Sequence, residues 1–116
     1  MSEADVQKAV ISHMRLRARA GVWWCHLNNN SANMIQGKRN KALGVTKGAP
    51  DLMFVAEGRA LFLELKAIKG RVAPAQTAAH VELRRAGAEC VVAHGLDEAL
   101  RVIGGWGLFS GGAACG

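Results

Sequence analysis

Asp51, Glu64 and Lys66 are the residues whose types and spacing could carry out chemistry. Asp51 follows Pro50, twelve residues separate it from Glu64, and Lys66 stands two positions beyond Glu64. Two carboxylates can bind Mg²⁺, which polarises a phosphodiester and lowers the pKa of a bound water. A nearby lysine can orient or deprotonate that water and stabilise the developing negative charge. The set therefore indicates phosphodiester hydrolysis with one or two metal ions.

These three side chains can meet only if a β-hairpin positions them. Residues 51–55 and 60–66 are strand-like, and the segment 57–59 predicts the turn between them. Such a hairpin brings Asp51 close to Glu64, and alternation along a strand places Glu64 and Lys66 on one face. A solvated ion pair is the alternative. Because Phe62 makes that second face apolar, the two charges are expected at the rim of a buried strand, where charges usually need each other or a metal.

The remaining elements follow from capping residues and hydrophobic periodicity. Ser2 and Asp5 predict a helix start, and Gly21 predicts its end. Pro74 and Gly87 bracket a second helix that runs to about residue 85, and Asp97 is expected to cap a third through residue 103. Further strands are expected at 22–27 and 89–93. The order α-β-β-β-α-β-α predicts an α/β fold, a mixed sheet flanked by helices.

Basic residues concentrate in two segments beside the expected site. Residues 28–48 form a polar stretch without an acid, expected to be a loop, and a basic turn follows the strand that ends at Lys66. Phosphate contact is expected in both segments, with a solvated surface as the alternative. The candidate DNA-binding residues are Lys38, Arg39, Lys41, Lys47, Lys69 and Arg71.

Length, composition and charge indicate the number of domains, the type of partner and the compartment. The chain has 116 residues, half of them apolar, which predicts one domain with its own core. A net charge of +6 favours an anionic partner such as nucleic acid. Three dispersed cysteines and a polar N-terminus predict neither a disulfide framework nor a signal peptide, and no apolar run is long enough for a membrane span. A cytoplasmic protein, of a bacterial or phage-infected cell, is expected.

Several stretches together resemble the VRR-NUC group of the PD-(D/E)xK nucleases, in its short stand-alone phage and bacterial form. The resemblance covers nearly the whole chain up to about Ile103. The matching residues are Glu3 with Gln7, Gly48 to Leu52, Phe62 to Lys66, Lys69 to Arg71, Pro74 to Gln76, Leu83 to Gly87, Val91 to Ala93 and Asp97 to Ala99.

The resemblance implies a restriction-endonuclease-like fold and a DNA endonuclease that depends on Mg²⁺, with Mn²⁺ as a substitute. Asp51 and Glu64 would bind the metal, helped by the backbone carbonyl of Leu65, and Lys66 would be the catalytic lysine. Gln76 would support the site or the water. Glu3 would complete the acid set, although Asp5 or neither residue could take that part.

The expected substrate is branched DNA, with a four-way (Holliday) junction as the leading candidate. Two symmetric cuts by a chain with one site predict a homodimer. Alternatives are a non-specific, flap or nicking nuclease with the same site, or a catalytically silent nucleic-acid-binding module. Residues 1–105 are expected to form the nuclease domain and residues 106–116 a Gly-rich tail, from which Trp106 could dock on the core. His80, one helical turn beyond Gln76, is a secondary candidate for the site.

Overall fold

The computed structural model describes residues 1–27, 38, 41–44 and 46–111. Its elements follow the predicted order. They are α1 (Glu3–Arg17), β1 (Trp23–His26), β2 (Leu52–Ala56), β3 (Arg59–Lys66), α3 (Pro74–Arg85), β4 (Glu89–His94) and α4 (Leu96–Gly105). Among these described helices, none has the length and apolar character that crossing a bilayer requires.

The strands form one mixed sheet in the order β1-β2-β3-β4. The two pairs that β2 makes, with β1 and with β3, are antiparallel, whereas β3 and β4 are parallel. The parallel pair requires a crossover connection, which α3 provides. The predicted mixed sheet is therefore confirmed.

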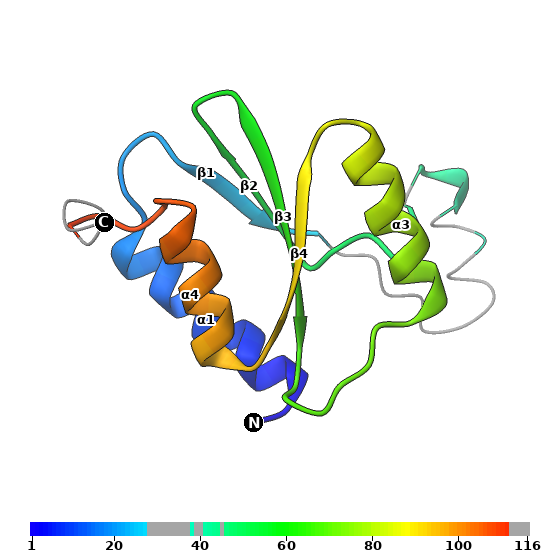
Figure 1. Ribbon diagram of the computed structural model, residues 1–116, viewed down its shortest axis with the longest axis horizontal. Coiled ribbons are helices and arrows are strands. Elements are labelled where there is room, and N and C mark those ends of the chain that lie inside the picture. Colours follow the sequence, from blue (N-terminus) through cyan, green and yellow to red (C-terminus); the bar gives the residue numbers. More distant parts are fainter. Residues whose placement is uncertain (28–37, 39–40, 45, 112–116) are drawn as a thin grey trace.

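Helices cover both faces of the sheet (Figure 1). Helices α1 and α4 lie together on one face, where the alternate residues Leu61, Leu63 and Leu65 of β3 are buried in the core. Helix α3 lies on the other side and packs against β4. Burying a side chain such as leucine contributes roughly 1.5–3 kcal/mol. Both faces of β3 are covered, as expected, because Phe62 on its second face is also buried.

The β2–β3 hairpin fixes the register on which the site depends. Glu57 and Gly58 both have positive φ, 53° and 75°, which is the backbone of a two-residue type I′ turn. Arg59 already pairs with Ala56, so the three-residue turn expected at 57–59 is one residue too long. The turn is shorter because the twist of a primed turn matches that of the flanking strands.

Two predicted helix starts are confirmed, and a third is wrong. Ser2 and Asp5 form the expected capping box of α1, and Pro74 opens α3. Helix α4, by contrast, begins at Leu96 after Gly95, and no side chain caps it. The chain leaves β4 through Gly95 at φ 87°, a conformation that glycine adopts readily, so Asp97 lies inside the first turn. Within the segment expected as a loop, Lys38, Lys41 and Ala42 are helical.

The core continues past residue 105, where the nuclease domain was expected to end. The ring of Trp106 docks on Phe54 with 5.8 Å between centroids, and Leu108 and Phe109 are buried. Backbone hydrogen bonds tie this segment to the end of α1, including one of 2.7 Å from the N–H of Ser110 to the carbonyl of Arg17. Residues 112–116 of the expected tail lie outside the described residues.

Candidate metal-binding active site

The candidate site lies at the edge of the sheet where β2 begins and β3 ends. Leu52 pairs with Leu63, so Asp51, just before β2, is brought opposite Glu64. Lys66 is the last residue of β3 and is paired with His94 at the end of β4. The hairpin thus brings together the acid pair and the lysine that the sequence pattern singled out.

Asp51 is held through both its side chain and its backbone. Its Oδ2 accepts a hydrogen bond of 2.7 Å from the backbone N–H of Leu65. Its carbonyl oxygen accepts from the N–H of Leu27 and from Nδ1 of His26, both at 2.8 Å. The amide of Gln7 lies 3.3 Å from the same His26 nitrogen. Asp51 is therefore tied to the strands on both sides of it.

Glu64 is the most deeply buried acid among the described residues, with 1% of its surface exposed. Gln76 of α3 donates from Nε2 to Oε2 of Glu64 at 3.1 Å. The Gln76 oxygen is itself occupied, because it accepts from the backbone N–H of Ala73 at 2.8 Å. This second contact fixes which end of the amide faces the acid. Gln76 therefore contacts Glu64, and the supporting role that the resemblance implied for it stays a prediction.

Helix α1 brings Glu3 to the same edge. Oε2 of Glu3 lies 3.8 Å from Nζ of Lys66, which also lies 3.9 Å from Oε2 of Glu64. Carboxylate oxygens of Glu3, Asp51 and Glu64 all lie within 4.8 Å of one another. Asp5 does not join this group, since its carboxylate accepts from the N–H of Ser2 in the capping box.

The electrostatics of Glu64 reflect this crowding. Burial, followed by the hydrogen bond and negative charge of Asp51, raises the pKa of Glu64 to about 9, while Lys66 acts in the opposite direction. His80, whose Nε2 lies 3.4 Å from Oε1 of Glu64, has a lowered pKa because it is buried and because Arg84 and Lys66 are nearby. A third acid, Glu3, adds to the repulsion. Three converging carboxyls and one lysine therefore leave an excess of acid.

A divalent cation fits this donor set. Carboxylate oxygens are the ligands that Mg²⁺ and Mn²⁺ prefer, and a cation would remove the repulsion that raises the pKa of Glu64. Glu3, Asp51 and Glu64 are the described residues that could hold such an ion. The N–H of Leu65 is bonded to Asp51, and the role expected for its carbonyl stays a prediction.

Three of the expected DNA-binding residues lie within five positions of a site residue in the sequence. Lys47 precedes Asp51, and Lys69 and Arg71 follow Lys66; all three cations are exposed. Lys38 and Lys41 are exposed too, whereas Arg39 lies outside the described residues. None of these five cations is neutralised by an acid among the described residues, because the ion pairs there involve other cations.

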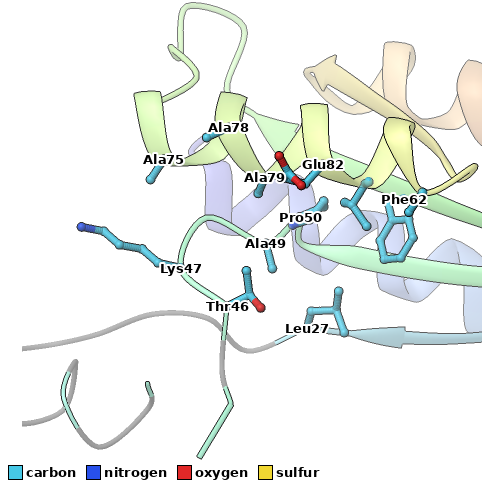
Figure 2. A pocket seen from close by; sticks show the side chains of 12 residues that line it. Leu27, Thr46, Lys47, Ala49, Pro50, Phe62, Ala75, Ala78, Ala79 and Glu82 are labelled. Atoms are coloured by element: carbon cyan, nitrogen blue, oxygen red, sulfur yellow. The ribbon is translucent and has the colours of Figure 1, made fainter. Parts of the chain in front are cut away.

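An apolar groove of about 650 Å³ lies beside the site (Figure 2). Phe62 of β3 and Leu27, just after β1, line it on one side, and three alanines of α3 line it on the other. Pro50, which directly precedes Asp51 in the chain, lines it too. Lys47 stands at its rim and extends away from its floor. The groove therefore combines an apolar surface with a cation at its rim.

Two histidines contact the site more closely than sequence reasoning indicated. His26 binds the backbone of Asp51, but its place at the end of a strand carries no signal of this. His80 does carry one, because it follows Gln76 by four residues and so falls on the same face of α3.

Comparison with known proteins gives the fold. No family model matches the chain, and no curated protein matches it. A solved structure described as "VRR_NUC domain protein" aligns over 91% of this chain and 88% of its own, with a TM-score of 0.76 and 24% identity. Another, described as "VRR_NUC domain", aligns over 87% and 92% respectively, with a TM-score of 0.59 and 21% identity. The chain therefore has the fold of VRR_NUC domains, as the sequence resemblance predicted.

Proposed function

We propose that this chain is a nuclease of the PD-(D/E)xK type, related to the VRR_NUC proteins whose fold it shares. One observation carries the proposal: oxygens of Glu3, Asp51 and Glu64 converge within 4.8 Å. Nζ of Lys66 lies within 4 Å of two of these acids. Both VRR_NUC names and this acid–lysine set favour phosphodiester hydrolysis over a silent binding module, which has no need of three converging acids with one of them buried.

The residues of the site would have separate roles in binding the metal and in hydrolysis. Asp51, Glu64 and Glu3 would hold Mg²⁺, for which Mn²⁺ can substitute, and Gln76 would keep Glu64 in place. The ion, when bound, would polarise the scissile phosphate and lower the pKa of the attacking water. Lys66 would orient that water and stabilise the charge that builds on the phosphate. The water oxygen forms a bond to phosphorus, one P–O ester bond breaks, and the departing oxygen takes up a proton.

The substrate we propose is DNA, held by the exposed cations that flank the acid cluster. Lys47 approaches from the segment before β2, and Lys69 and Arg71 approach from the segment after β3. The described residues hold one acid cluster, which would cut one strand at a time. Symmetric cutting of a four-way junction would therefore require a two-fold homodimer, and we propose that arrangement for the active species.

The test is a cleavage assay on a labelled four-way junction and on a linear duplex of the same sequence, with Mg²⁺ or with EDTA. We expect Mg²⁺-dependent cutting of the junction, reduced by roughly 10²-fold or more in Lys66→Ala. The matched control is Lys8→Ala, because Lys8 is an exposed lysine of α1 outside the site. Equal cutting of the duplex would remove the junction preference. Binding without cutting in both Mg²⁺ and Mn²⁺ would overturn the nuclease.

A further inference from the structure

Helix α3 presents one buried titratable side chain, His80, to the metal edge of the sheet. His80 is 2% exposed and is the buried residue of an otherwise half-exposed helix. Packing alone does not require histidine here, because an aliphatic side chain would fill the same space without a polar group to satisfy. A buried imidazole needs a hydrogen-bond partner, and the partner it has is Glu64.

The contact is complementary to the one that Gln76 makes. Nε2 of His80 lies 3.4 Å from Oε1 of Glu64, while Nε2 of Gln76 lies 3.1 Å from Oε2. Residues four apart on a helix lie on the same face, so α3 contacts the two oxygens of one carboxylate with two successive turns. A carboxylate that binds a cation is ionised and can only accept, so His80 must then carry its proton on Nε2.

We infer that His80 is a positioning residue which, with Gln76, fixes the orientation of the Glu64 carboxylate toward Glu3 and Asp51. This inference rests on the proposed metal-dependent function. Each carboxylate oxygen has two lone pairs, so a hydrogen bond to each oxygen leaves acceptor capacity for a cation. Such supporting contacts to a metal ligand typically change metal affinity 10- to 100-fold when removed.

The test measures Mn²⁺ binding to the full chain without DNA, by titration calorimetry and by the electron paramagnetic resonance signal of free Mn²⁺. His80→Leu keeps apolar volume but removes the N–H, and His80→Gln restores a donor. We expect His80→Leu to weaken Mn²⁺ binding about 10- to 100-fold, and His80→Gln to recover most of it. His80→Ala serves the same comparison if His80→Leu does not fold.

A control separates positioning from general destabilisation of α3. Leu83→Ala removes a half-buried side chain of the same helix that lines the groove and does not contact the acids. We expect it to lower the thermal unfolding temperature while Mn²⁺ affinity stays that of the wild type. Kinetic measurements in Mn²⁺ should show that His80→Leu raises the metal concentration needed for half-maximal rate, and that saturating Mn²⁺ restores kcat.

Mn²⁺ binding by Glu64→Gln distinguishes failure of the His80 positioning role from failure of the metal site. If wild type binds Mn²⁺ and Glu64→Gln does not, the metal site stands; unchanged Mn²⁺ affinity in His80→Leu would then overturn the positioning role alone. If wild type and Glu64→Gln bind Mn²⁺ equally weakly, the metal site itself fails, and the inference about His80 fails with it.

Discussion

Glu64 is the residue whose environment departs furthest from what a free side chain would meet. It is 1% exposed, and it lies among two other acids and one lysine. Burial and Asp51 together raise its pKa to about 9, so without a cation Glu64 holds a proton at neutral pH. Cation binding must then release that proton. At the scale of single residues, metal binding and protonation of Glu64 are thus competing processes.

This competition predicts how the stability of the metal-free protein depends on pH. The ordinary pKa of a glutamate is 4.5, and the pKa of Glu64 in the folded state is about 9, so between these values the folded state holds a proton that the unfolded chain has lost. The stabilisation this gives is lost as pH rises through the folded pKa. We expect the unfolding temperature in EDTA to fall between pH 7 and 9 in wild type, but much less in Glu64→Gln, whose amide does not ionise.

The control for this pH series is Glu82→Gln, because Glu82 is an exposed acid on α3 that is not one of the converging carboxyls. Its unfolding temperature should follow that of wild type at every pH. Parallel curves for wild type and Glu64→Gln would mean that Glu64 is already ionised in the metal-free protein, contrary to the prediction.

Strand patterning placed some of these residues together, whereas Glu3 was named only through the family resemblance and His80 only from its spacing to Gln76, for a physical reason. Asp51, Glu64 and Lys66 belong to one hairpin, so strand alternation and a short turn were enough to bring them together. Glu3 and His80 reach the same place only because α1 and α3 pack on the sheet at particular rotations. Those rotations depend on the whole core, which the local pattern around either residue does not encode.

At the scale of elements, the segment before β2 and the start of α3 approach each other closely. An added Cβ at Gly48 would lie 2.3 Å from the carbonyl oxygen of Ala75, and Gly48 has φ +81°. Asp51 lies three residues after Gly48, and Gln76 directly follows Ala75. The glycine therefore lets the segment that carries Asp51 come close to the helix end that carries Gln76, the residue that contacts Glu64.

Gly48→Ala should separate these two segments. We expect a loss of roughly 1–3 kcal/mol in the free energy of unfolding from the clash and the left-handed backbone. We also expect weaker Mn²⁺ binding, because Asp51 and the Gln76 contact to Glu64 can no longer both keep their places. Urea unfolding and Mn²⁺ titration measure the two effects.

Gly44→Ala is the matched control, since Gly44 has φ +83° and nothing within 4 Å of an added Cβ. It carries the backbone strain without the clash, so it should lower stability by less and leave Mn²⁺ affinity unchanged. Equal effects of the two substitutions would show that the close approach of Gly48 to α3 has no part in the site.

Element order followed from the sequence, whereas some element ends did not. Caps that use side chains, such as Ser2 with Asp5, leave a readable signal. The start of α4 has none, because the turn out of β4 is made by the backbone of Gly95 next to Ile68. Likewise, burial of Leu108 and Phe109 depends on a distant contact with α1, which no periodicity in a Gly-rich segment reports.

At the scale of the whole molecule, an acidic site lies within a basic protein. The net charge is +6, yet the described acid cluster gathers three carboxyls at one edge of the sheet. The segments before β2 and after β3 carry exposed cations that form no ion pair with any described residue. DNA could therefore be attracted over a long range by the molecule as a whole, while only the phosphate nearest the edge would meet the acids.

This distribution predicts a strong and localised salt dependence of DNA binding. We expect the logarithm of the association constant for duplex DNA to fall linearly with the logarithm of salt concentration. Removing Lys69 and Arg71 together should reduce the magnitude of that slope by about 2, since each phosphate contact contributes roughly 0.9. Fluorescence anisotropy in Ca²⁺, with Lys66→Ala as the background to prevent cutting, measures the slope.

The control removes the same amount of charge elsewhere. Arg15 and Arg85 are exposed near the C-terminal ends of α1 and α3, twelve and nine residues from Glu3 and Gln76 respectively. At 1.5 Å of rise per residue, roughly 18 and 13 Å of helix separate them from the site. Arg15→Ala with Arg85→Ala should weaken binding slightly and leave the slope nearly unchanged. If both pairs reduce the slope equally, net charge alone attracts DNA and the flanking cations make no specific phosphate contacts.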